Sequence, residues 1–268
     1  MLLSIVLCLE SFPMKTQLIA LQTIVNREIT RFLRIWIQTL LPPVITQSLY
    51  FVIFGKFIGS QIGQIHGVSY MSFIVPGLVM MAVINNAFTN VVSSFFSSKF
   101  QRSIEEIWVS PTAEWAVVAG YAAGGILRGV LVGIIVFGIS IFFVHPQIHN
   151  LAVIIIFIFL TAAVFALGGL VNAIFAKKFD DVSIFPTFVL TPLTYLGGVF
   201  YSIHNLPPLW QKLSLVNPIL YMVNGFRFGF YGFSDVSLVV SVLILVFFAI
   251  ALSCISLYLL KKGVGIKS

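Results

Sequence analysis

Six long runs of apolar residues, each nearly free of charge, restrict the fold of this chain more than any other feature of its sequence. The runs extend over about Ile35–Phe57, Tyr70–Ser97, Val117–Val144, Leu151–Ala176, Ile184–Tyr201 and Val236–Leu260. About 20 apolar residues are enough for a helix to cross the hydrocarbon core of a bilayer. Only 9% of the 268 residues are charged, whereas soluble domains carry about 25%. The sequence therefore predicts an all-α integral membrane protein with six transmembrane helices, and it excludes a cytosolic enzyme and a nucleic-acid-binding protein.

The basic residues indicate how these helices are oriented. Lys56, Lys212 and Arg227 fall on one side of the predicted membrane and Arg128 lies inside a run, which leaves eleven of the fifteen basic residues on the opposite side. Cytoplasmic loops carry an excess of Lys and Arg. We therefore expect both termini in the cytoplasm, as an even number of spans requires.

The residues before the first run form a segment with a different pattern. Apolar side chains recur at helical spacing between Leu18 and Trp36, while four charged side chains, those of Arg27, Glu28, Arg31 and Arg34, occupy other faces. This pattern predicts a helix in the membrane interface, and a cytoplasmic extension of the first span is the alternative. The chain thus divides into an N-terminal extension with an interfacial helix, residues 1–34, and a six-helix transmembrane domain, residues 35–268.

Charge is concentrated between the second and third runs, over residues 99–115. Arg102 and Glu106 are four residues apart and could pair on a helix, while another face carries an apolar strip of Ile104, Ile107 and Trp108. Ser110 followed by Pro111 has the pattern of a helix N-cap and first helical position. We predict a short amphipathic cytoplasmic helix that fits a groove on a partner subunit. A solvated loop is the alternative.

The stretch between the fifth and sixth runs, Tyr201–Asp235, is long and apolar for an exterior loop. It is broken by prolines and rich in aromatic residues, and its marker residues are Pro207, Trp210, Pro218, Tyr221 and Arg227. Two half-helices that dip into the outer leaflet would satisfy their backbone groups if protein buries them. We therefore predict a re-entrant exterior element, although a position at the membrane interface would also explain the aromatic content.

Polar side chains inside three of the runs are candidates for a substrate path. They are Asn86, Asn90, Arg128, Thr187, Thr191 and Thr194. Arg128 lies within the membrane zone, where it could meet an anionic substrate group or hydrogen-bond to helix-end carbonyls. Hydrogen bonds between helices are the alternative explanation for the others. Gly125, Gly129 and Gly133 form a small-residue face that favours close helix packing.

No motif for catalysis is present in the sequence. It contains no G-x-x-x-x-G-K-[ST] phosphate loop, no H-E-x-x-H and no G-x-S-x-G. The four histidines fall in predicted exterior loops, and Cys8 and Cys254 are too few for a metal site. We expect no catalytic residue, no metal site and no cofactor in this chain, which cannot hydrolyse ATP by itself.

A pattern around the fifth run resembles the signature of a known family. It consists of Leu190-x-x-Leu193-x-x-Leu196-Gly197-x-Val199, then Leu206-Pro207, then Pro218-Ile-Leu-Tyr221 with Arg227 further on. This pattern is similar to that of ABC transporter type-2 permeases. The neighbouring residues 74–78, 179–182 and 188–201 look closest to the YadH branch of bacterial inner-membrane permeases. The resemblance runs from about Met14 to the C terminus, which leaves Met1 and Met14 as alternative starts.

The resemblance implies the transmembrane permease subunit of an ATP-driven ABC exporter in the bacterial inner membrane. Such a subunit forms the substrate path as a homodimer and docks two separate ATPase subunits, which hold the ATP and Mg. The resemblance also implies an ATPase-docking region at Arg102, Glu105, Glu106 and Trp108, with the N-terminal helix as the connecting helix. The expected partners are these ATPases, a second copy of the chain and membrane lipid, but no nucleic acid. An ATP-independent secondary transporter or membrane scaffold is the alternative.

Overall fold

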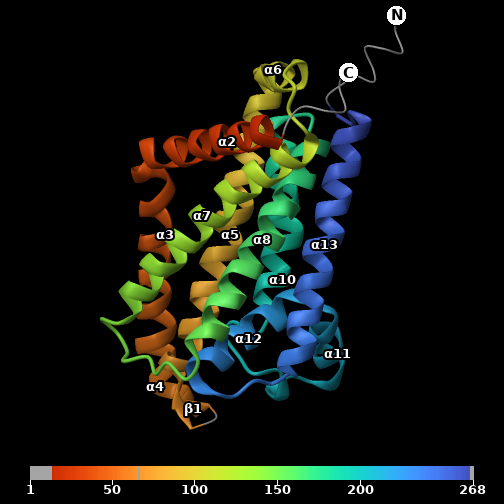
Figure 1. Ribbon diagram of the computed structural model, residues 1–268. Coiled ribbons are helices and arrows are strands. Elements are labelled where there is room, and N and C mark those ends of the chain that lie inside the picture. Colours follow the sequence, from red (N-terminus) through yellow and green to blue (C-terminus); the bar gives the residue numbers. More distant parts are fainter. Residues whose placement is uncertain (1–13, 66, 266–268) are drawn as a thin grey trace, which may run out of the picture.

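The computed structural model describes residues 14–65 and 67–265, except for the side chains of Lys56, Ile107 and Trp108. The chain folds into a bundle of helices (Figure 1), in order α2 (Met14–Arg34), α3 (Trp36–Tyr50), a π-helix (Phe51–Ile58), α4 (Gly59–Ile62), α5 (Tyr70–Phe100), α6 (Ser103–Val109), α7 (Glu114–Ser140), α8 (Leu151–Phe175), α9 (Phe179–Phe185), a π-helix (Pro186–Leu190), α10 (Thr191–Tyr195), a 3-10 helix (Ile203–Asn205), α11 (Pro208–Val216), α12 (Pro218–Tyr231) and α13 (Leu238–Lys262). Two short antiparallel strands, β1 (Gln64–Ile65) and β2 (Val68–Ser69), pair Gln64 with Ser69.

Five helical stretches among the described residues are long and apolar enough to cross a membrane. They are Trp36–Ile62, Tyr70–Phe100, Glu114–Ser140, Leu151–Phe175 and Leu238–Lys262. The remaining predicted run, Ile184–Tyr201, forms a shorter helical stretch that begins at Phe179 and ends at Tyr195. It ends early because the chain turns at Gly198, whose φ of 72° favours glycine. The prediction of long apolar helices is therefore confirmed for five of the six runs.

The N-terminal helix is separate from the first span. Ile35, between α2 and α3, has φ −109° and ψ 36°, so the helix is interrupted there. The Thr39 hydroxyl donates a hydrogen bond to the Phe32 carbonyl oxygen at 3.0 Å, which satisfies a carbonyl at the end of α2. Figure 1 shows α2 lying across one end of the bundle while α3 runs along it. A continuous cytoplasmic extension of the first span is therefore wrong.

Helix α5 lies at the centre of the bundle. Of its most apolar 18 residues, 83% are buried, whereas the corresponding share in α13 is 11%. The predicted small-residue face of α7 packs on α5: a Cβ atom at Gly125 would lie 2.5 Å from Val91 Cγ2, and one at Gly129 would lie 3.1 Å from the Val83 carbonyl oxygen. A side chain at either glycine would force the neighbouring atoms of α5 to shift, because Cβ atoms rarely come so close to other atoms.

The end of the bundle opposite α2 and α6 holds the predicted exterior element (Figure 1). Helices α11 and α12 have prolines in their first turns, Pro208 and Pro218, where a missing N–H costs no helical hydrogen bond. The Asn217 side chain caps α12 by accepting a hydrogen bond from the Ile219 N–H at 3.0 Å. Most residues of α12 are buried. The stretch therefore contains two helices, as the sequence predicts, and each of them begins at a proline.

The segment after α5 corrects two expectations of the sequence analysis. Helix α6 forms, but Arg102 precedes it in a left-handed conformation with φ 58°, so Arg102 and Glu106 do not share the helix and form no ion pair among the described residues. The next helix does not begin at Pro111. The Gln17 side chain of α2 donates to the Pro111 carbonyl oxygen at 2.8 Å and accepts from the Ala113 N–H at 2.7 Å. This contact keeps the backbone extended until α7 begins.

Candidate functional site

A buried polar network joins α2 to the long helices. The Glu28 side chain is 0% exposed. One of its carboxylate oxygens accepts a hydrogen bond from the Ser94 hydroxyl of α5, and the other accepts from Arg31 Nη2 at 3.1 Å. The same Arg31 nitrogen donates to Asn90 Oδ1 at 2.8 Å. A buried carboxylate is tolerated when it is paired and hydrogen-bonded, so this arrangement fastens α2 to α5.

The sequence of α7 lets α2 come this close. A Cβ atom at Gly124 would lie 2.6 Å from Glu28 Cβ, and one at Gly120 would lie 2.6 Å from Ile24 Cγ2. Sequence analysis placed Glu28 on the charged face of the N-terminal helix, whereas the structure buries it. The signal was present, because Ile24, Glu28 and Phe32 follow one another at four-residue spacing on one helical face.

A second branch of the network starts at Arg27 of α2. Arg27 Nη2 donates a hydrogen bond to the Tyr121 hydroxyl of α7. That hydroxyl in turn donates to Ser98 Oγ of α5 at 3.1 Å. No local sequence pattern indicates these partners, because 94 residues separate Arg27 from Tyr121. Arg27 is therefore linked to both α7 and α5.

Arg128 forms a separate set of buried hydrogen bonds. It is 8% exposed, and its Nη2 atom donates to the Thr39 carbonyl oxygen at 3.3 Å and to Asn86 Oδ1 at 3.2 Å. Of the six candidate path residues, Asn90 therefore belongs to the network around Glu28, whereas Asn86 and Arg128 bond to each other. The carbonyl that Arg128 contacts lies inside α3.

The three threonines of the fifth run do not join this network. Thr187 and Thr191 are exposed, whereas Thr194 is 1% exposed. The Thr191 and Thr194 hydroxyls donate to carbonyl oxygens of their own helical stretch, at 2.9 and 2.7 Å. The three threonines do not share one exposed face, because the π-helix over Pro186–Leu190 changes the helical register between them.

Helix α6 has a hollow on each side. The first, which we call the α2–α6 groove, has a volume of about 260 Å³ and is lined by Ala20, Thr23, Ile24, Arg27, Glu106, Ser110 and Thr112. The second, which we call the basic pocket, has a volume of about 250 Å³ and is lined by Phe96, Lys99, Phe100, Arg102, Ile104, Glu105, Lys177 and Gly265. Glu105 and Glu106 thus line different hollows. The side chain of Trp108 lies outside the described residues.

Arg227 joins three elements at the exterior end. It is 0% exposed, its Nη2 atom donates to the Gly198 carbonyl oxygen at 2.7 Å, and its guanidinium carbon lies 3.8 Å from the ring centre of Phe73. Nearby, a Cβ atom at Gly77 would lie 2.6 Å from the Val199 carbonyl oxygen. The signature residues around Gly198 and Arg227 therefore pack the end of α10 against α12 and α5.

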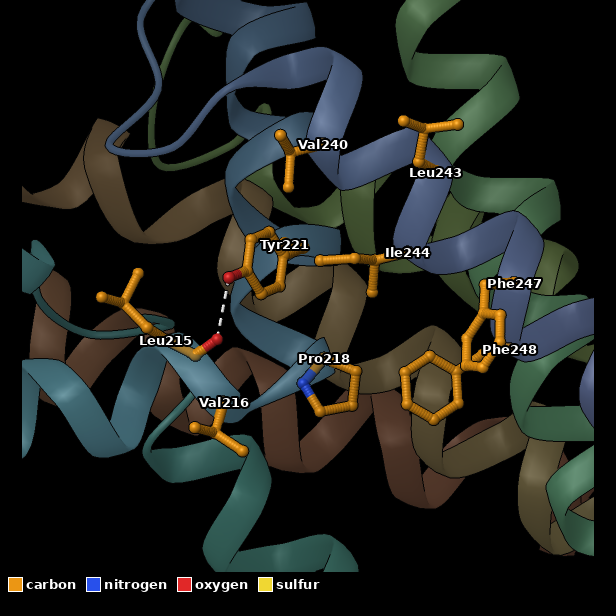
Figure 2. A pocket seen from close by; sticks show the side chains of 9 residues that line it. All are labelled: Leu215, Val216, Pro218, Tyr221, Val240, Leu243, Ile244, Phe247 and Phe248. Atoms are coloured by element: carbon orange, nitrogen blue, oxygen red, sulfur yellow. Dashed lines mark hydrogen bonds between the residues drawn. The ribbon is translucent and has the colours of Figure 1, made fainter.

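The other marker residues of the exterior element lie nearer the surface. Pro207 precedes α11, and Trp210 is 45% exposed. The Tyr221 hydroxyl donates to the Leu215 carbonyl oxygen at 2.8 Å. Figure 2 shows the adjoining apolar hollow of about 400 Å³, which lies between α11 and α12 on one side and α13 on the other; it is lined by Leu215, Val216, Pro218, Tyr221, Val240, Leu243, Ile244, Phe247 and Phe248. Among the described residues, no group of three His, Cys, Asp or Glu could hold a metal ion.

The sequence matches one protein family and several known proteins over most of its length. The family described as ABC-2 type transporter matches residues 19–231. The inner membrane transport permease YadH of Escherichia coli (strain K12) is 57% identical over 250 residues, which cover 93% of this chain and 98% of YadH. Nodulation protein J of Rhizobium leguminosarum bv. viciae is 23% identical over 180 residues, which cover 67% of this chain and 70% of that protein.

These matches confirm the resemblance that the signature residues indicated. ABC-2 permeases lack an ATPase site of their own and pair with ABC ATPase subunits. The five long apolar helices agree with a multi-pass protein, and the homology to YadH places it in the inner membrane. The chain therefore belongs to the ABC-2 type transporter family and is a transmembrane permease similar to YadH.

Proposed function

We propose that this permease is the membrane subunit of an ATP-driven exporter, and that an ATPase subunit docks in the α2–α6 groove. One observation carries this proposal: Arg27 lines the groove and also bonds to Tyr121 of α7. Glu28, the next residue, is fastened to α5 through Ser94. A partner that moves α2 would therefore act directly on two long helices, which is the mechanical link that an ATP-driven transporter needs.

In this proposal α2 is the connecting helix in the cytoplasmic membrane interface. Residues 1–34 form the N-terminal extension and residues 35–268 the transmembrane domain. Helix α6 is the cytoplasmic coupling helix, with Glu106 facing the docked ATPase. Arg102 and Glu105 line the basic pocket on the other side of α6, so we expect them to contribute less to docking.

We take the stretch from Phe179 to Tyr195 as the remaining span, the fifth of six along the chain. Both termini then lie in the cytoplasm. The stretch begins beside the end of α5, where the rings of Phe100 and Phe179 lie 4.8 Å apart. It ends beside the far end of α3, where the hydroxyls of Tyr50 and Tyr195 lie 3.3 Å apart. The stretch thus extends between the two ends of the bundle. At about 1.5 Å per residue it would span about 25 Å. The helices α11 and α12 would then form the re-entrant exterior element.

We also propose that two copies enclose the substrate path. The exposure of the first span, Trp36–Ile62, supports this proposal. Only 17% of its most apolar 18 residues are buried within one copy. Thr187 and Thr191 are exposed and are available to such a path. Asn86, Asn90 and Arg128 are held between helices, so they would reach a substrate only when these helices separate.

Copurification tests the proposal. The tagged chain, purified from gently solubilised membranes, should carry an ATP-hydrolysing subunit in stoichiometric amount. Glu106→Lys should lose this subunit. Glu105→Lys makes the same change of charge at the neighbouring residue but on the other side of α6, and it should retain more of the subunit. An oligomer free of ATPase, also after crosslinking in the membrane, would favour the ATP-independent alternative.

A further inference from the structure

The basic pocket brings together cations from three elements. Lys99 lies near the end of α5, Arg102 in the turn before α6, and Lys177 just after α8. Glu105 is the single acidic residue among those that line the pocket. Opposing charge inside the pocket is therefore insufficient for three cations.

The surrounding contacts do not remove this excess of charge. Lys99 Nζ donates to the carbonyl oxygens of Ile174 and Ala176 at 2.8 and 2.7 Å, where it satisfies acceptors at the end of α8. The side chains of Arg102 and Lys177 form no ion pair with any residue of the described part of the chain.

Asp181 is a further carboxylate near these cations. It accepts hydrogen bonds from the backbone N–H groups of Lys177 and Lys178 at 2.8 and 3.0 Å. Its bonded oxygen is thus committed to the backbone at the start of α9. With Asp181 included, the cluster still holds more cations than carboxylates.

One rim of the pocket is apolar and uncovered. Phe100 lines the pocket and is 62% exposed. Its ring packs edge-on against that of Phe179, which is 59% exposed. This pair lies where two of the apolar helices, α5 and α8, end, at the level of the predicted membrane surface. A ligand with an anionic group and an attached apolar chain would match both parts of this surface.

We propose that the basic pocket binds the phosphate headgroup of an anionic phospholipid in the cytoplasmic leaflet, with its acyl chain against Phe100 and Phe179. Basic pockets at the cytoplasmic ends of membrane helices are suited to such headgroups. The exposed rings favour a lipid over an acidic side chain of a partner protein, which would leave them uncovered. This inference does not depend on ATPase docking, because the α2–α6 groove lies on the other side of α6.

Native mass spectrometry of the full chain in detergent tests this inference. The chain is titrated with phosphatidylglycerol and, separately, with zwitterionic phosphatidylcholine. Phosphatidylglycerol should bind more tightly. Arg102→Gln and Lys177→Gln should each weaken its binding about fivefold, since a basic residue near the surface contributes about that factor to the attraction of anionic lipid. Both side chains are exposed, and size-exclusion chromatography verifies that the variants fold.

Arg34→Gln is the matched control, because it removes an exposed charge at the same end of the bundle, from the last turn of α2. It should leave the affinity for phosphatidylglycerol unchanged. Equal affinities for the two lipids, or equal losses in Arg34→Gln and Lys177→Gln, would overturn the proposal. Inorganic phosphate should not displace the lipid at equal concentration; if it does, the pocket is a site for free phosphate and the assignment to lipid is wrong.

Discussion

Arg128 Nη2 lies 3.3 Å from the backbone carbonyl oxygen of Thr39 on the neighbouring helix α3. In a regular helix this carbonyl would accept a hydrogen bond from the N–H of residue 43. Residue 43 is a proline inside α3 and has no N–H. Pro43 thus leaves an acceptor unused, and Arg128 occupies it. The arginine inside the third run therefore compensates for a proline inside the first.

A double-mutant cycle tests this relationship between Arg128 and Pro43. Arg128→Met should lower the free energy of unfolding by about 1–3 kcal/mol, because it leaves the Thr39 carbonyl and Asn86 without their donor. The same substitution should cost less in a Pro43→Ala background, where the restored N–H can bond to Thr39. The fraction of chain that stays monodisperse after heating measures both effects. Equal losses in the two backgrounds would show that Arg128 and Thr39 are not coupled.

Glu28 gives a second prediction. Glu28→Gln removes the negative charge that faces Arg31 and should lower stability by about 1.5–3 kcal/mol, the range for hydrogen bonds to charged groups. It should also weaken the coupling of ATP hydrolysis to transport, since α2 would be held less firmly to α5. Glu105→Gln is the control, because Glu105 is exposed and outside the network. The heating assay compares the two, and matching losses would remove the structural role given to Glu28.

A pair of glycine substitutions tests the packing of the signature residues. Gly77→Ala should destabilise the chain by about 1–3 kcal/mol, because its Cβ would lie 2.6 Å from the Val199 carbonyl oxygen and the backbone would have to shift. Gly138→Ala makes the same change on α7, where nothing lies within 4 Å. It should be neutral or stabilise by up to about 1 kcal/mol. The midpoint temperatures of thermal unfolding should therefore shift in opposite directions in the two variants, or by clearly different amounts.

The sequence predicted the apolar helices well because their length and hydrophobicity are local properties. It also predicted a short helix at α6 and two helices between residues 201 and 235, since the prolines and the apolar spacing that indicate them are local features. It missed the burial of Glu28 and the bridge from Gln17 to Ala113, because these depend on α2 lying across the bundle. It did not predict that Thr194 faces another way than Thr187 and Thr191, because the sequence offers no clear signal for the π-helix over Pro186–Leu190.

Photo-crosslinking tests the central claim most directly. A photoreactive residue is placed at Thr23 or Thr112, both of which line the α2–α6 groove, and, as a control, at Lys212 on α11 at the exterior end. Irradiation of intact cells should crosslink each groove variant to the same ATP-hydrolysing subunit. The variant at position 212 should give no such product. No ATPase adduct from either groove position, in a chain that reaches the membrane and folds, would contradict docking in this groove.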